Sequence, residues 1–318
     1  MTDAQVGPPL YENWLSFRGG AVPNLSFECP LFSDAYFTGE VASGLGPYEL
    51  TNPLAVHDVG VVRPAIVLRY AQCLTHDPST IDFSRTDSSR YHGASATEEM
   101  AALLSLSLGV RVRAGGATRL FDGGDPRGSP VLYSANENPG ALHLRGVGPV
   151  LPEAFAERCI NDAVLIPRFS GLEPREAVAL IQAARQYQEA LWVAEVQPEI
   201  AWIVLVSAIE VAASHWRPAL EPPRDRLATS RPDLERVLLE AGGEELATRV
   251  ADLLAPYMGA TRKFLDFCVT FMPPEPDQRP PEYAAFVGRP DPDGVIEDHL
   301  RPSLTGSPWG NAIPHADV

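Results

Sequence analysis

The sequence predicts an α+β fold, with a β-containing N-terminal half and an all-α C-terminal half that forms a helical bundle. Through residue 95, glycine, proline, asparagine and aspartate interrupt short apolar runs such as VGVVRPAIVLRYA (59–71), a pattern typical of strands and long loops. From Pro174 onward, alanine, leucine, isoleucine and tryptophan recur at helical spacing. This change of pattern indicates two halves of different secondary structure.

The length of 318 residues is enough for two modest domains or one large one, each able to bury a core. We expect a β-rich domain at 1–165, which contains one helix and a hairpin at about 97–121, and a helical bundle at 170–275. Residues 276–318 are predicted to be a proline-rich loop and a disordered tail, because MPPEPDQRPPEY precedes a segment without helical periodicity.

Within 97–121, the sequence TEEMAALLSLSLGVRVRAGGATRLF predicts a helix followed by a hairpin. Thr97 is the expected N-cap, and Gly109 is the expected left-handed C-cap. VRVR and ATRLF both alternate around the turn AGG, which is typical of a β-hairpin. The following residues, 122–170, read as irregular or β-like and contain no catalytic motif.

The helical half divides at its prolines and glycines. One helix is expected to start at Pro174 and end near 196, and a second to start at Pro198 and stop before Pro218. The second helix is apolar on all sides, which predicts a central helix surrounded by the others. The segment 222–232, PPRDRLATSRP, is predicted to be a linker.

Three further helices are expected after this linker. The first of them ends at the pair Gly242 and Gly243, the next runs through EELATRVADLLAPYM, and the last is TRKFLDFCVTF.

Composition excludes several classes of partner. The net charge of −16 argues against a broad basic face for duplex DNA, although 25 lysines and arginines leave room for a small basic groove. The four cysteines are far apart without a CxxC pair, so a thiolate zinc site is not expected. No motif for another cofactor was identified, and none is expected. The longest apolar run, 200–206, is far shorter than the roughly 20 residues that span a bilayer, and the N-terminus lacks a signal-peptide pattern. We expect a cytoplasmic protein without membrane contact.

Candidate catalytic residues in the N-terminal half are few. His57 and His76 each precede an aspartate, and His92 lies in the turn-like triplet YHG. Adjacent residues on a strand point to opposite faces, so neither His–Asp pair converges on one atom unaided. Loop histidines beside solvated aspartates are the simpler interpretation; an unrelated hydrolase with its site in this half is the alternative.

Glu210 is an isolated carboxylate within the apolar segment IAWIVLVSAIEVAASHW (200–216). If its helix is central, the carboxylate is partly buried and needs a cation, a hydrogen-bond donor or a proton, because an isolated buried charge is unfavourable. Arg185 and Arg262 are the candidate cations within the chain. The alternative is that Glu210 reaches solvent at the end of the helix.

Three stretches of the helical half resemble a family of uncharacterised bacterial proteins related to the Apea-like HEPN domains: AARQYQEALWVAE, PEIAWIVLVSAIEVAASHW and GATRKFLDFCVTFMPPEPDQRPPEY. The upstream segment EEMAALLSLSLGVRVRAGG also resembles this family, so the resemblance covers most of 90–285. The motifs are specific as a set, although none is specific alone.

The resemblance implies a helical bundle that forms a homodimer, and a metal-independent endoribonuclease of the defence type with RNA as its partner. The family signature is R-x(4–6)-H on a late helix. Its histidine would act as a general acid or base, and its arginine would stabilise the charged transition state. The glutamate of the central helix, Glu210 here, would hold that arginine.

Residues 286–318 depart from this pattern, because they contain no R-x-x-x-x-H. Read from the second base of each codon, the codons of 299–317 are compatible with IYDHRSRALHGGTPFPTPM, which carries the signature. We infer a frameshift just upstream of His299. The chain is therefore predicted to be a HEPN-like RNA-binding or RNA-cleaving protein without an intact catalytic site, with Glu210 as a remnant. A non-catalytic interaction or dimerisation module is the alternative from a different class.

Overall fold

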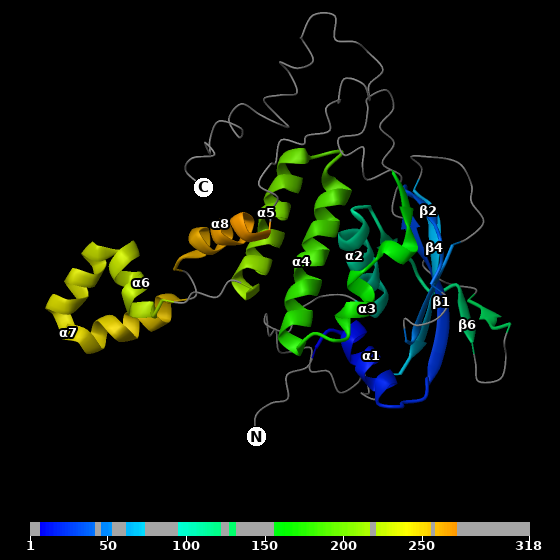
Figure 1. Ribbon diagram of the computed structural model, residues 1–318, viewed down its shortest axis with the longest axis horizontal. Helices are drawn as coiled ribbons and strands as arrows, with labels where there is room; N and C mark the ends of the chain where they lie inside the picture. The colour runs from blue at the N-terminus through cyan, green and yellow to red at the C-terminus, as the bar shows by residue number, and fades with distance from the viewer. Residues whose placement is uncertain are drawn as a thin grey trace, which may run out of the picture. The chain divides into compact units, whose positions relative to one another are not determined.

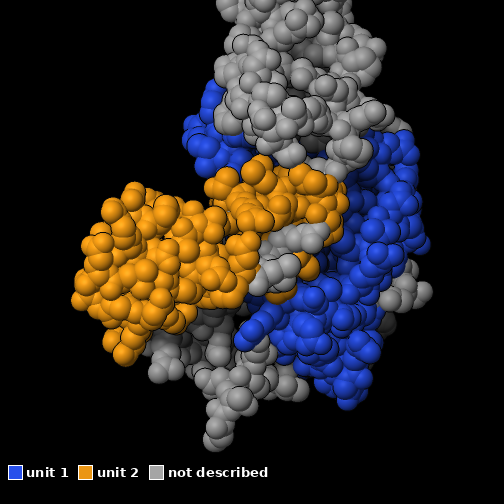
Figure 2. Space-filling view, turned by 60° about the vertical axis from the view of Figure 1, so that its left-hand side comes forward, with its two compact units in different colours: residues 1–208 blue, residues 209–318 orange. Residues whose placement is uncertain are grey.

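The computed structural model describes residues 7–41, 46–52, 62–73, 95–121, 127–131, 156–216, 221–255 and 258–271. The chain forms two compact units, Met1–Ala208 and Ile209–Val318 (Figure 2). This division lies about forty residues beyond the expected domain boundary, because the helix that begins at Pro174 packs into the core of the first unit. The fold is α+β, with a sheet in the N-terminal part and helices in the C-terminal part (Figure 1).

The first unit contains an antiparallel sheet whose longest strands are β1 and β4. The strand order is β3-β4-β1-β6-β7, and β5 also pairs with β1. A separate parallel pair joins β2 and β8. The strands are β1 (Leu25–Ser33), β2 (Tyr36–Thr38), β3 (Tyr48–Thr51), β4 (Arg63–Gln72), β5 (Arg113–Ala114), β6 (Arg119–Phe121), β7 (Ser129–Pro130) and β8 (Glu157–Cys159).

The predicted hairpin is wrong in its pairing. The last residue of VRVR and the alanine after it form β5, and ATRLF supplies β6, but both strands pair with β1 rather than with each other. β5 pairs with Leu31 and Phe32, and β6 with the segment from Ser26 to Glu28. The long strand β1 thus takes up the hydrogen bonds that a local hairpin would have made.

Helix α2 (Ala96–Leu108) forms where the sequence predicts it, but the predicted N-cap Thr97 is wrong, because the helix begins two residues earlier. Its N-cap is Ser95, whose hydroxyl accepts a hydrogen bond from the Glu98 backbone N–H, while the Glu98 side chain accepts from the Ser95 backbone N–H. Gly109 ends the helix at φ 68°, as predicted.

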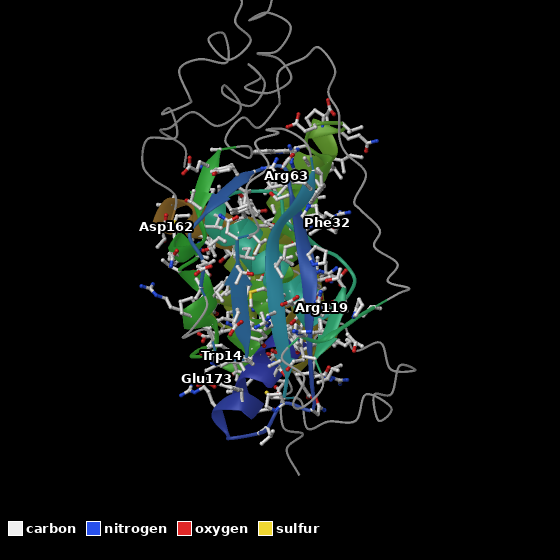
Figure 3. All side chains as sticks on the ribbon, turned by 90° about the vertical axis from the view of Figure 1, so that its right-hand side faces the viewer. Trp14, Phe32, Arg63, Arg119, Asp162 and Glu173 are labelled. Carbon is white, nitrogen blue, oxygen red and sulfur yellow. The ribbon has the colours of Figure 1, made fainter. Side chains whose placement is uncertain are left out.

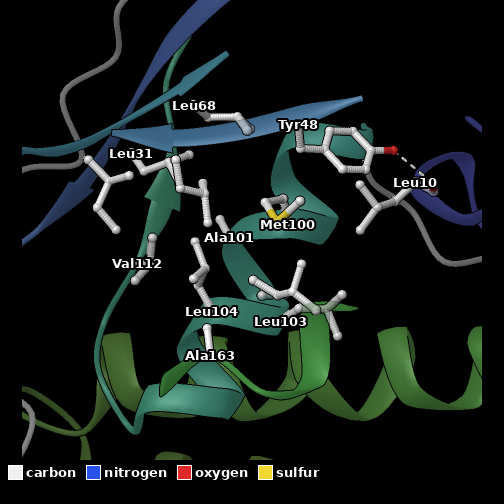
Figure 4. Packing of buried hydrophobic residues seen from close by; sticks show 14 of the residues in the cluster. Leu10, Leu31, Tyr48, Leu68, Met100, Ala101, Leu103, Leu104, Val112 and Ala163 are labelled. Atoms are coloured by element: carbon white, nitrogen blue, oxygen red, sulfur yellow. Dashed lines mark hydrogen bonds between the residues drawn. The ribbon is translucent and has the colours of Figure 1, made fainter. Parts of the chain in front are cut away.

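α2 lies at the centre of the first unit, between the sheet and α4 (Figure 1). On one side, Met100 and Leu104 face strand residues that include Leu31 and Leu68 (Figure 4). On the other side, α4 contributes small and branched residues to the same core. The remaining helices of this unit are α1 (Pro9–Arg18), the 3₁₀ helix Ile160–Asp162, α3 (Leu165–Phe169), α4 (Pro174–Val193) and the start of α5 (Pro198–Trp216).

α1 was not expected from the sequence, which predicts strands and loops in this region. Pro9 occupies its first position, where proline has no hydrogen bond to lose. The side chains of Leu10 and Tyr11 are buried in the core below α2, and the Tyr11 hydroxyl donates to the Leu172 carbonyl.

The second unit is helical in its described part and includes α6 (Pro223–Ser230), α7 (Pro232–Leu254) and α8 (Ala260–Phe271). The predicted linker is wrong, because most of it forms α6, whose Leu227 packs with Ala251 and Met258. The two helices expected around Gly243 are the two halves of α7, which kinks at that residue (φ 70°). The predicted last helix is confirmed as α8. The expected proline-rich loop and tail lie outside the described residues.

α5 begins and ends as predicted, but the expectation of a central, surrounded helix is wrong. Only 17% of its apolar window is buried. Its contact with α4 is made near the turn between the two helices, through the small residues Ala190, Ala194 and Ala201. Large apolar side chains of α5 therefore remain in contact with solvent in the described structure.

Candidate functional site

Glu210 lies on α5 and is exposed, so the expected partial burial of its carboxylate is not found. The two candidate cations have other neighbours. Arg262 pairs with Glu221 at 3.2 Å, and Arg185 lies close enough to buried Glu99 to favour the ionised form of that carboxylate. The role of Glu210 as a remnant of a catalytic site stays a prediction.

His57, His76 and His92 lie outside the described residues, and so does the segment that contains His299. Within the described part of the chain, no group of three or more histidine, cysteine, aspartate or glutamate side chains is placed to hold a metal ion. The hydrolase alternative, which uses these three histidines, thus stays a prediction. The frameshift of the signature segment also stays a prediction.

Asp34, Arg111 and Glu195 form a buried charge network in the first unit. Arg111 donates from Nη2 to Asp34 Oδ2 at 2.5 Å and from Nε to Asp34 Oδ1 at 3.3 Å. Its Nη1 lies 3.4 Å from Glu195 Oε1. The side chains of Arg111 and Glu195 are each 1% exposed, and that of Asp34 is 3% exposed. This network, named the Arg111 network below, lies wholly within the first unit.

Burial dominates the electrostatics of the Arg111 network. Removal from water raises the pKa of Asp34, although the charge and hydrogen bonds of Arg111 act to lower it, and Glu195 adds a smaller effect in the raising direction. The geometry between Arg111 and Asp34 is bidentate, which is the strongest arrangement of this pair. Such a network is suited to holding segments together, because separating them would leave buried charges without their partners.

The three segments that the network joins are distant in sequence. Asp34 directly follows β1, Arg111 follows α2, and Glu195 belongs to the turn between α4 and α5. The residues 111–113 are named the strap below, because each of them contacts the last turns of α4 or the turn that follows.

The rest of the strap contacts α4 itself. The Val112 carbonyl accepts a hydrogen bond from Gln188 Nε2. Arg113 pairs with Glu189 at 2.6 Å, and its guanidinium lies 4.9 Å from the centre of the Trp192 ring. The exposed Arg113 pair thus lies on the last turns of α4, and the buried Arg111 network lies at the turn that follows.

A second buried acid, Glu99, lies at 0% exposure on α2. Its Oε2 accepts a hydrogen bond from the Leu10 backbone N–H at 2.8 Å, which is one of the first N–H groups of α1. Burial raises the pKa of Glu99 well above its usual range, although Leu10 and Arg185 act to lower it. The Tyr48 hydroxyl donates to the Leu10 carbonyl, so both polar backbone groups of Leu10 are bound. This site attaches α1 to the core.

The outer face of the sheet carries alternating charges, and Figure 3 shows this side of the molecule. Register places Glu49, Arg69, Glu28 and Arg119 side by side across β3, β4, β1 and β6. Arg69 pairs with Glu28 at 2.7 Å and with Glu49 at 3.4 Å. Acids and bases satisfy one another here, which is typical of a solvated sheet face rather than of a binding site.

An exposed apolar surface forms on the first turns of α5. Ile200, Trp202 and Ile203 are 46%, 48% and 63% exposed, and they are named the α5 surface below. By length and composition alone α5 could cross a membrane, and most of its apolar window is not buried.

No protein-family model, curated protein or solved structure matches this chain.

The Arg111 network was not predicted from the sequence, although a signal was present. Asp34 stands in the run LFSDAYF and Glu195 in ALWVAEV, so both are acids within apolar surroundings, as Glu210 is. VRVR contains two arginines, Arg111 and Arg113. One of them is fully buried, because the first unit places two carboxylates around it.

Proposed function

We propose that this chain is a non-catalytic interaction protein that pairs with a second copy of itself through the α5 surface. The observation that supports this proposal is the exposure of three large apolar side chains within one turn of a long apolar helix. Covering apolar area gains roughly 25 cal/mol per Å², so contact of this surface with water is unfavourable and association relieves it.

The composition of α5 favours a second α5 as the occupant. The helix contains no lysine or arginine, so it offers no charge that a nucleic acid or an acidic partner would need. In an antiparallel pair about a twofold axis at Ile203, this side chain meets its own copy, and Ile200 meets Val206 of the second copy. The pair brings apolar side chains together and opposes the two helix dipoles.

Cross-linking tests this arrangement directly. Ile203→Cys is expected to form a disulfide-linked dimer of the full chain under mild oxidation, because the twofold axis brings the two introduced thiols together. The same substitution at Val237, which is 53% exposed on α7, is the matched control and should stay uncrosslinked. Because the chain has four free cysteines, the unsubstituted protein is oxidised in parallel. Equal cross-linking in all three proteins contradicts the proposal.

Solution mass gives a second measurement. Light scattering after size exclusion should report a dimer for the unsubstituted chain and a monomer for Ile203→Glu, since that change places two carboxylates at the axis. Val237→Glu should remain dimeric. A monomer at all concentrations for the unsubstituted chain contradicts self-association, and flotation of the chain with phospholipid vesicles instead of pairing indicates a lipid surface as the occupant.

We also propose the RNA-related function as a second candidate, since α4, α5 and α8 are helical at the residues that carry the resemblance. This chain is expected not to cleave single-stranded RNA in the presence of a metal chelator. A variant with 299–317 replaced by IYDHRSRALHGGTPFPTPM should cleave it, and should lose activity when the first arginine or the second histidine of that segment is replaced by alanine. An inactive variant that still dimerises leaves interaction as the function.

A further inference from the structure

The turn between α4 and α5 is held by buried charge as well as by apolar contact. Three buried alanines, Ala190, Ala194 and Ala201, join the two helices, and the partly buried side chains of Val193, Val204 and Leu205 pack against them. Opposite them, Glu195 brings a buried carboxylate to the guanidinium of Arg111, and Asp34 holds the other edge of that guanidinium at the end of β1. Arg111 thus links the turn to the end of β1.

A buried ion network often contributes little net free energy to the stability of a fold. Removing charges from water is unfavourable, and apolar side chains of similar volume are often equal or better at the same place. Buried charges are instead suited to specify one arrangement, because a displaced charge would stay unpaired. The Arg111 network has the features expected of such a device, since it is bidentate, buried and shared among three distant segments.

We propose that the Arg111 network is a conformational latch, which holds the α4–α5 turn on the sheet and opens without unfolding the α2 core. When Glu195 leaves Arg111, the turn and the first residues of α5 move as a unit, while α2 keeps its packing against the sheet and α4. This proposal holds whether or not the α5 surface binds a second copy. When the latch is closed, it fixes the position of the α5 surface relative to the sheet.

Hydrogen exchange of the full chain measures this opening. Several backbone N–H groups report on the turn, among them those of Val196 and Gln197, which both donate to the Val193 carbonyl, and that of Ala201, which donates to the Gln197 carbonyl. The amides of α2 report on the core. Glu195→Gln keeps the shape of the side chain and removes its charge, so exchange at 194–201 should rise by about tenfold or more with α2 unchanged.

Two further variants complete the test. Asp34→Asn loosens the other end of the latch and should give the same pattern. Glu189→Gln breaks the exposed pair with Arg113 on the same stretch of α4, and it should leave exchange at 194–201 as in the unsubstituted chain.

Two results overturn the latch. If exchange of the turn and of α2 rises together in Glu195→Gln and Asp34→Asn, the Arg111 network stabilises the whole unit and does not open separately. If neither segment changes, the network does not hold the turn.

Discussion

Asp34, Glu99 and Glu195 are acids buried in the first unit, and each lies against a donor or a cation. Asp34 and Glu195 share Arg111, and Glu99 accepts from the Leu10 N–H under the influence of Arg185. Glu210, the acid that the sequence singled out, is exposed. Apolar neighbours in the sequence therefore do not by themselves predict that an acidic side chain is buried. Burial depends on whether the segment that carries the acid packs against the core of the first unit.

Glu99 gives a prediction about pH. Its pKa is raised in the folded state, so its contribution to stability is fully present below the ordinary value of 4.5 and is lost as the pH rises through the higher folded value. Glu99→Gln keeps an oxygen for the Leu10 N–H and cannot ionise. The variant should therefore gain stability relative to the unsubstituted chain as the pH rises.

Urea midpoints measured between about pH 5 and about pH 8 check this expectation. Glu240→Gln, on the exposed side of α7, serves as the control and should show no such trend. A constant difference between Glu99→Gln and the unsubstituted chain over this range contradicts the assignment of Glu99 as the titrating group.

At the scale of elements, the ends of several helices could be predicted because their signals are local. Pro174 and Pro198 begin α4 and α5, and Gly109 ends α2. The pairing of β5 and β6 could not be predicted, because alternation shows that a segment is a strand and not which strand it joins. The burial of Arg111 was missed for the same reason, since its partners are distant in sequence.

Gly109 tests whether backbone conformation or space requires glycine at the end of α2. The residue has φ 68°, and the nearest atom to an added Cβ is the Tyr187 hydroxyl oxygen at 3.9 Å, so there is room for a side chain. Gly109→Ala should lower the free energy of unfolding by about 1–2 kcal/mol through backbone strain alone. Gly171→Ala, whose backbone is not left-handed, is the control in urea denaturation, and equal losses in both variants contradict strain as the cause.

At the scale of the molecule, the two units differ in the size of the hydrophobic core formed by their described residues. The first unit has one large cluster that joins α1, α2, α4 and the sheet. The described core of the second unit centres on Leu227, Ala251 and Met258, with Leu238 and Leu254 beside them. The α+β class was predicted from the change of sequence pattern, but the position of the division was not, because α4 carries the helical pattern while packing on α2.

Separate cores predict separate responses to core substitutions. Leu227 is fully buried between α6 and α7, and Leu227→Ala should destabilise the second unit by about 2–5 kcal/mol through lost contacts and the cavity that remains. Hydrogen exchange should then accelerate in α6 and α7 and stay unchanged in α2. Leu104→Ala, in the core of the first unit, is the reciprocal variant and should accelerate exchange in α2 with α6 and α7 unchanged. If either substitution accelerates exchange equally in both units, the two cores unfold as one cooperative structure, and the division at residue 208 has no energetic counterpart.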